Sequence, residues 1–300
     1  MKTIYHKPVM LKEAIQGLKI DPDGVYVDVT FGGGGHSSAI LQKLSNKGRL
    51  LAFDQDEAAH QNSISDDRFH LINGNFSHLK RHLKFCGITT VDGILADFGV
   101  SSNQFDSGSR GFSTRLEGPL DMRMNTKSEL SARALINEYS VEELQQIFKN
   151  YGELRVARKL AEHIVKERNQ NPIETTQGLV SLLTPILPKH IFNKIIAQVF
   201  QAVRIEVNAE LEVIKSFLEQ TVEVLQTGGR LVCISYHSLE DRLVKIFIRE
   251  GKFVGKAESD LYGKRNLPMK KVGNLQIPSQ EEIKENSRAR SGKLRIAERI

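Results

Sequence analysis

The feature that most constrains the fold of this chain is a strand pattern that runs directly into four successive glycines. The apolar stretch VYVDVT begins at Val25 and is followed by FGGGGHS, after which a helical pattern starts near Ser37. Glycine has no Cβ, so a glycine turn lets backbone N–H groups and the start of a helix approach a ligand closely. Packing alone does not require four adjacent glycines, although a tight turn without a ligand is the alternative. The pattern therefore predicts a ligand-binding turn between a strand and a helix.

After this turn, short strand patterns alternate with helical patterns. Apolar runs typical of strands lie at 49–54, 69–73 and 91–97, and helical patterns lie at 37–45 and 77–85. Such alternation indicates βαβ units, whose strands form a parallel sheet. The sequence thus predicts an α/β fold built on a Rossmann-like sheet.

The pattern changes after Asp97. The next residues, to about 125, are rich in Gly, Ser, Asp and Arg and have weak periodicity, which predicts a long loop. Nearly all of 128–225 is helical in pattern and includes the capping box Ser140-x-x-Glu143. A mostly helical domain is therefore expected to interrupt the sheet domain after its fourth strand. The expected bounds are 1–107 and 210–300 for the discontinuous sheet domain, and 108–209 for the inserted domain, with a cleft between them.

The last part of the chain returns to the sheet. Gly228-Gly229 is expected to stop the last inserted helix, and GRLVCIS, which includes Gly229, predicts a buried strand. A helix is expected at 238–250, followed by a polar stretch. The closing segment KLRIAERI alternates in polarity and is expected to pair at the sheet edge.

The glycine turn can be compared with known nucleotide-binding motifs. A phosphate-binding P-loop needs GK followed by Ser or Thr, and no GK pair in the sequence continues in that way. The dinucleotide fingerprint G-x-G-x-x-G would place its third glycine at Ser37, which weakens a nicotinamide cofactor without excluding it. The run Asp28-x-Thr30-x-Gly32-x-Gly34 resembles the D-x-G-x-G-x-G signature of methyltransferases that use S-adenosylmethionine, with Thr30 in place of the first glycine.

Carboxylates end two of the predicted strands. Asp54 ends the second strand, where it could accept both ribose hydroxyls of a nucleoside, with Asp56 as a nearby competitor and a solvated acid as the alternative. Asp97 ends the fourth strand in the sequence DFGV, but the chain has no HRD or APE motif of a kinase. GVSSN around Ser101 lacks the last glycine of a nucleophile elbow, so hydrolase chemistry is not indicated. We expect Asp97 in the cofactor cleft.

Composition limits the class of protein and its partners. The 300 residues include no apolar run of membrane-spanning length and no signal-peptide pattern, which predicts a cytoplasmic protein. Cys86 and Cys233 form no metal motif, and His78 and His82 lie among basic residues, so we expect no metal. The net charge is +6, and residues 252–300 carry all of it, with 12 Lys plus Arg against 6 Asp plus Glu. This local excess favours a nucleic-acid partner.

Seven motifs spread over the chain carry a resemblance to a known family. They are FGGGGHS, LADFGVSS, RGFS, GPLDMRM, FQAVRIEVNAEL, ISYHSLEDR and SRARSGKLRIAER. Together they resemble the 16S ribosomal RNA N4-cytosine methyltransferase H family, also called RsmH or MraW, over the range from Tyr5 to Ile300. The resemblance implies S-adenosylmethionine as cofactor and methyl transfer to N4 of a cytosine in the decoding region of 16S ribosomal RNA, within the small ribosomal subunit. Another nucleic-acid amino group, a nicotinamide oxidoreductase, a non-catalytic RNA-binding module and a homodimer stay open at this stage.

The resemblance also implies cofactor contacts. These are Gly34, Gly35, His36, Asp54, Phe76, Asp97 and Gln104, with Gly33 as a neighbouring candidate. Without the resemblance, Phe76 would be interpreted equally well as an ordinary core residue. Gln104 carries almost no signal of its own.

Three residues are candidates for accepting a proton from the amino group that is methylated. They are Asp97, Asp121 in the DMRM segment, and His237 after the fifth strand, for which a purely structural role is the alternative. Methylation at C5 would need a reachable cysteine nucleophile, whereas both cysteines look structural, so direct N-methylation is the better inference. Phe98, Phe112 and Tyr236 are candidates for holding the unstacked base, and Arg110, Arg115 and Arg123 for binding RNA.

Overall fold

The computed structural model describes residues 8–259, 262 and 265–300 of the chain. Contacts divide the chain into two compact units, of which the first comprises Met1–Gly99 and Leu211–Ile300 and the second comprises Val100–Glu210. None of the helices in the described part is both long enough and apolar enough to cross a membrane. Tyr5, where the family resemblance begins, and Lys264, one of the basic residues in 252–300, lie outside the described residues.

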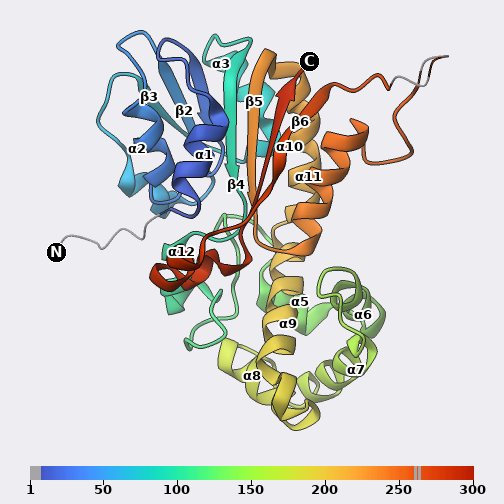
Figure 1. Cartoon of the computed structure of the whole chain (residues 1–300). Helices are drawn as coiled ribbons and strands as arrows, with labels where there is room; N and C mark the ends of the chain where they lie inside the picture. Colours follow the sequence, from blue (N-terminus) through green and yellow to red (C-terminus); the bar gives the residue numbers. More distant parts are fainter. Residues whose placement is uncertain (1–7, 260–261, 263–264) are drawn as a thin grey trace. The chain divides into compact units, whose positions relative to one another are not determined.

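The first unit is built on one seven-stranded sheet of order β3-β2-β1-β4-β5-β7-β6 (Figure 1). Strands β1 to β5 run parallel, whereas β7 is antiparallel to both β5 and β6. The strands are β1 (Val25–Asp28), β2 (Arg49–Asp54), β3 (Phe69–Asn73), β4 (Val91–Asp97), β5 (Leu225–Ser235), β6 (Met269–Gln276) and β7 (Lys293–Arg299). This is the Rossmann-like topology of class I methyltransferases that the sequence predicted.

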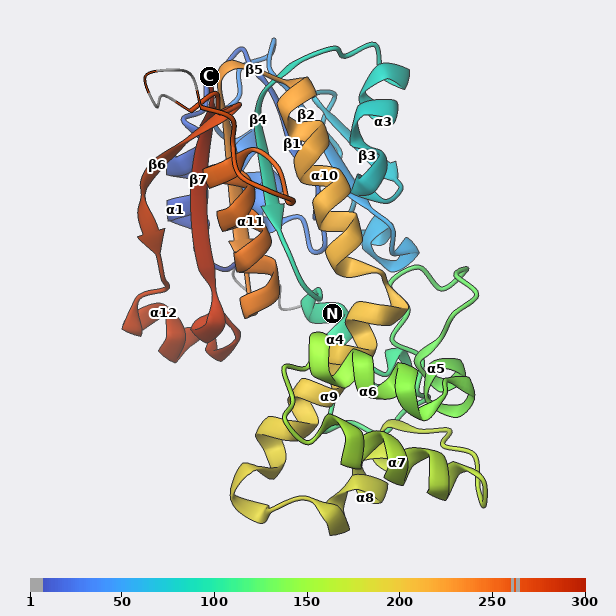
Figure 2. The same ribbon diagram turned by 90° about the vertical axis from the view of Figure 1, so that its right-hand side faces the viewer.

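Helices cover both faces of this sheet, so that its central strands are buried on both sides (Figure 2). One apolar layer joins the sheet to α1 and α2, and the other joins it to α3, α10 and α11. The helices of this unit are α1 (Leu11–Leu18), α2 (Gly35–Leu41), α3 (Leu79–Phe85), α10 (Glu210–Val224, of which Glu210 is assigned to the second unit), α11 (Ser238–Glu250) and α12 (Gln280–Glu285). Burial on both faces explains why the central strands are almost purely apolar in sequence.

Two details of the sheet differ from the sequence-based expectation. The segment KLRIAERI forms β7 but lies between β5 and β6, so the edge strand on that side of the sheet is β6, which the sequence pattern did not predict. The pair Gly228-Gly229 does not end a helix, because α10 ends at Val224 and β5 already includes both glycines. The left-handed backbone of Gly228, with φ of 83°, lies inside this irregular strand start.

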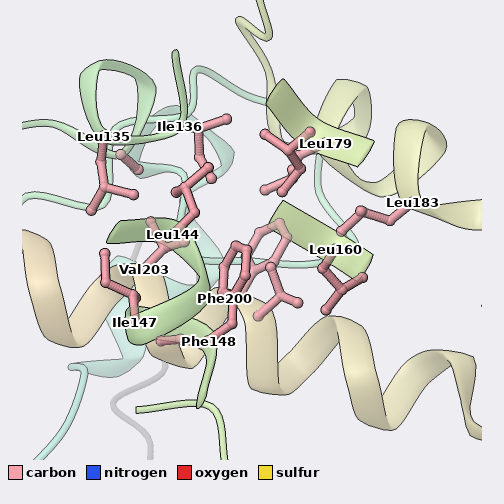
Figure 3. Packing of buried hydrophobic residues seen from close by; sticks show 14 of the residues in the cluster. Leu135, Ile136, Leu144, Ile147, Phe148, Leu160, Leu179, Leu183, Phe200 and Val203 are labelled. Atoms are coloured by element: carbon pink, nitrogen blue, oxygen red, sulfur yellow. The ribbon is translucent and has the colours of Figure 1, made fainter. Parts of the chain in front are cut away.

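The second unit is helical and has its own apolar core, part of which Figure 3 shows. Residues Leu144, Phe148, Leu160 and Phe200 from three different helices meet there and are almost fully buried. The helices are α4 (Ser102–Asp106), α5 (Ala132–Glu138), α6 (Val141–Asn150), α7 (Ala157–Arg168), α8 (Thr176–Leu183) and α9 (Phe192–Val207). The predicted capping box at the start of α6 is present, with Ser140 as N-cap.

Candidate active site

The glycine turn connects β1 to α2 and depends on glycine for its backbone shape. Gly32 and Gly34 have φ of 51° and 75°, in the left-handed region that side chains disfavour. A Cβ on Gly35 would lie 2.2 Å from the Pro8 ring. The structure thus confirms a tight glycine turn between a strand and a helix, while its ligand stays a prediction.

Asp28 holds this turn from inside the sheet. Its side chain is buried and accepts hydrogen bonds from Ser37 Oγ at 2.7 Å and from the Thr30 backbone N–H at 3.1 Å. Thr30 Oγ1 in turn accepts the backbone N–H of Asp97 at 2.7 Å. Asp28 and Thr30 thus attach the turn to the ends of β1 and β4. Asp28, the first residue of the D-x-G-x-G-x-G signature, therefore has a structural role.

Asp54 lies at the end of β2, beside the turn. Its two carboxylate oxygens accept the backbone N–H groups of Gly32 at 2.9 Å and of Asp56 at 2.8 Å. Burial raises the pKa of the Asp54 carboxyl to about 6, although these two N–H donors act in the opposite direction. Each oxygen keeps lone-pair capacity for a further donor, such as a ribose hydroxyl.

Asp97, at the end of β4, is the centre of a hydrogen-bonded group. Tyr236 Oη donates to Oδ1 of Asp97 at 2.7 Å, and His36 Nδ1 lies 3.7 Å from Oδ2. His36 Nε2 lies 3.2 Å from the carbonyl oxygen of Val9, which can only accept, so Nε2 carries a proton and Nδ1 faces Asp97. The two partners lower the pKa of Asp97, but burial dominates and raises it to about 6.

Tyr236 was a candidate for holding the unstacked nucleobase, and the sequence did not predict its hydrogen bond to Asp97. A signal for it exists in the topology, because Tyr236 directly follows β5, the parallel neighbour of the strand that ends at Asp97. Carboxyl ends of neighbouring parallel strands meet at one edge of a sheet. Burial, together with the charge of Asp97, raises the pKa of Tyr236 well above its ordinary value, which keeps the hydroxyl a donor.

Phe76 lies in an aromatic cluster behind this edge. Its ring centroid is 5.4 Å from that of Phe217 and 6.2 Å from that of Phe98. Phe98 and Phe217 are almost fully buried, whereas Phe76 is partly exposed. Phe76 therefore combines a core contact with a free ring surface, and Phe98 is a core residue.

His237 is held at the start of α11. Its Nδ1 accepts the backbone N–H of Glu240 at 3.4 Å, while Nε2 lies 3.0 Å from Oε1 of Glu240. The other Glu240 oxygen accepts the backbone N–H groups of Tyr236 at 2.7 Å and of His237 at 3.2 Å. These contacts form a capping box, which is a structural task for His237. Its catalytic role stays a prediction.

Asp121 and Gln104 belong to the second unit, whereas the residues described above belong to the first. Arg123 binds both oxygens of Asp121, at 3.0 and 2.7 Å, and donates its backbone N–H to the same carboxylate. Partial burial acts to raise the pKa of Asp121, but the Arg123 bonds outweigh it and lower the pKa. Gln104 is buried, and its side-chain oxygen accepts the backbone N–H of Ser101 at 3.1 Å.

Comparison with known proteins agrees with the motifs over nearly the whole chain. The sequence model of the MraW methylase family matches residues 3–300. A protein of Christiangramia forsetii named ribosomal RNA small subunit methyltransferase H is 59% identical over 296 residues, which cover 99% of this chain and 98% of the relative. Proteins of the same name from Flavobacterium johnsoniae and Cytophaga hutchinsonii are 56% and 52% identical, over 99% of this chain and 98% and 100% of their own lengths. The chain therefore belongs to the MraW methylase family.

Proposed function

We propose that this protein transfers the methyl group of S-adenosylmethionine to the exocyclic N4 of a cytosine in the decoding region of 16S ribosomal RNA. Membership of the family makes the chain a methyltransferase that uses S-adenosylmethionine, so the nicotinamide alternative is dropped. The observation that carries the chemistry is the half-buried carboxyl of Asp97, which accepts a hydrogen bond from Tyr236 and lies 3.7 Å from His36 Nδ1, at the carboxyl ends of the strands where the glycine turn also lies.

The residues at the carboxyl ends of the parallel strands fit the cofactor. Gly33, Gly34 and Gly35 form a turn without side chains, whose backbone the cofactor would approach closely. Asp54 would accept the ribose hydroxyls with its remaining lone pairs, and the partly exposed ring of Phe76 would pack on the adenine. When bound, S-adenosylmethionine supplies a methyl group on a positively charged sulfur.

Asp97 is favoured among the three candidates for accepting the amino proton. The N4 lone pair of cytosine is delocalised into the ring, so an acceptor that holds an N4 proton orients the group for attack on the methyl carbon. With a pKa of about 6, Asp97 is ionised near neutral pH yet basic enough to hold or relay a proton. Asp121 is a weaker base because Arg123 engages both of its oxygens, and His237 is engaged by the helix cap.

The state of the cysteines supports direct methylation at nitrogen. Methylation at C5 of cytosine proceeds through a cysteine thiolate. Cys233 lies inside β5, and burial raises its pKa far above the ordinary range, so its thiol stays protonated. Cys86 is the C-cap of α3, is half-buried and packs against the apolar core of the first unit.

The second unit would recognise the RNA, and the assembled small subunit in the cytoplasm would be the substrate. Exposed Arg115 in its long loop is available for a phosphate, whereas Arg110 donates to the backbone of Arg123 and Met124. Phe112 is buried in the core of this unit and is not available to hold a base. A homodimer stays a prediction, which sedimentation of the purified chain tests.

Incubation with labelled S-adenosylmethionine and unmodified 30S subunits, followed by nucleoside analysis, tests the proposal. We expect label in N4-methylcytidine, and strongly reduced label with the Asp97→Asn variant. Label in a different methylated nucleoside would support another nucleic-acid amino group as target. Absence of any labelled nucleoside from subunits and from free RNA would refute the proposed substrate.

A further inference from the structure

A second concavity lies in the first unit, beside the edge strand of the sheet. It has a volume of about 400 Å³ and is lined by residues of α11, β6 and β7 and of the segment that leads into β6. Figure 2 shows these three elements next to one another, and contacts join α11 to both strands. We call this concavity the edge hollow. None of the residues assigned above to the candidate active site lines it.

The inner surface of the edge hollow is apolar. Ile248 of α11 and Met269 of β6 contribute to it and are almost fully buried. Leu267, which precedes β6, and Leu275, near the end of β6, also line it. Leu275 keeps 39% of its surface exposed. An apolar surface of this kind, open to water, is suited to a flat uncharged group such as a nucleobase.

The rim is strongly basic, because six cations and no carboxylate line the edge hollow. The cations are Lys245, Arg249, Arg265, Lys270, Lys271 and Arg295. The nearby carboxylates do not neutralise this rim, since each of them is shared between two cations. Glu250 contacts Arg249 and Arg265, Asp241 contacts Arg295 and Lys293, and Glu298 contacts Lys270 and Arg230.

Two lysines of the rim remain for an external anion. Within the part of the chain that the structure describes, neither Lys245 nor Lys271 has a carboxylate within ion-pair distance, and Lys271 contacts only the amide oxygen of Asn274, at 3.1 Å. Arg295 is held in place by two hydrogen bonds to Asp241, at 2.7 and 3.1 Å. A fixed guanidinium plane is a stacking surface for an unpaired base.

We propose that the edge hollow binds single-stranded RNA, with a base against its apolar wall and the flanking phosphates on Lys245 and Lys271. The proposal rests on the proposed function, because ribosomal RNA then supplies the polyanion. Residues 252–300, which carry the net positive charge of the chain, supply ten of the thirteen residues that line this hollow and four of its six cations. The edge hollow would add a contact to RNA outside the residues that carry out methyl transfer.

The test measures binding of a fluorescent oligouridylate to the full chain, without cofactor, over a range of salt concentrations. For the double variant Lys245→Ala/Lys271→Ala we expect about tenfold weaker binding near 0.1 M salt and a salt slope smaller by about 1.4, because each lost single-strand phosphate contact removes about 0.7. Leu275→Ala should weaken binding without changing the slope. The matched control is Lys43→Ala/Lys47→Ala, two exposed lysines between α2 and β2, which should leave the slope unchanged.

Several results would overturn the proposal. An unchanged affinity and slope in the Lys245/Lys271 variant would do so, and so would an equal loss in the control variant. A change in sedimentation of the Leu275→Ala variant, with RNA binding intact, would mean that the hollow joins two copies of the chain. Since binding is measured without methyl transfer, a failure of the edge hollow is distinguishable from a failure of the proposed function, which the nucleoside analysis reports.

Discussion

Replacing Tyr236 by Phe removes a single hydroxyl from the centre of the candidate active site. That hydroxyl donates to Oδ1 of Asp97 at 2.7 Å, and the carboxylate is the form of Asp97 that accepts the bond. The ring is unchanged in the variant, so its packing against neighbouring residues is retained. The variant therefore isolates the effect of one hydrogen bond on the ionisation of Asp97.

The size of the effect follows from the strength of such a bond. A hydrogen bond to a charged group stabilises it by about 1.5–3 kcal/mol, and 1.36 kcal/mol corresponds to a tenfold change in a protonation equilibrium. Loss of the bond disfavours the carboxylate, so the pKa of Asp97, about 6 in the wild type, rises. Because part of the Asp97 side chain is exposed to water, we expect the lower end of this range, a rise of roughly one pH unit.

The assay is kcat as a function of pH with saturating cofactor and 30S subunits. If ionised Asp97 accepts the amino proton, activity falls on the acid side, and this limb should move to higher pH in Tyr236→Phe by about one unit. The variant should be slow at pH 6.5 and recover most of its activity near pH 8.5. Tyr139→Phe, which removes a hydroxyl that donates to Glu206 at 3.3 Å in the second unit, serves as control and should keep the wild-type profile. An equal loss of activity at every pH would refute the reasoning.

Three further changes test other parts of the site. Asp54→Ala should weaken cofactor binding tenfold or more in calorimetric titration, since a hydrogen bond to a charged group stabilises by about 1.5–3 kcal/mol, and unchanged affinity would exclude the ribose contact. Gly34→Ala should lower the free energy of unfolding in urea by about 1–2 kcal/mol, because φ at this position is 75° and the added Cβ would lie 3.0 Å from the Phe31 ring. Burial raises the pKa of Asp97 in the folded state to about 6, above its ordinary value of 3.8, so folding favours the protonated carboxyl. The stability that Asp97 contributes is therefore fully present below about pH 4 and is lost as the pH rises through 6. Relative to Asp97→Asn, the wild type should therefore lose about 3 kcal/mol over that interval, and parallel stability curves would contradict the assignment.

Local patterns in the sequence predicted most helices and strands closely. The strands expected at 49–54, 69–73 and 91–97 and the helix expected at 238–250 have the same bounds in the structure. Strands buried on both faces are long apolar runs, and capping residues mark helix starts, so both signals lie within a few neighbouring residues. The edge strand β6 escaped prediction because five of its eight residues are polar or glycine, as suits a strand with one exposed edge.

The sequence by itself determined that a glycine turn joins a strand to a helix, and that Asp54 and Asp97 end parallel strands of one sheet, while the cofactor site at these strand ends stays a prediction. Only the tertiary structure decided what each polar group does there. Tyr236 reaches Asp97 across 139 positions of the chain, while His237 is turned to the cap of α11. The physical reason is that the basicity of a side chain depends on its burial and on its hydrogen-bond partners, and long-range packing supplies both.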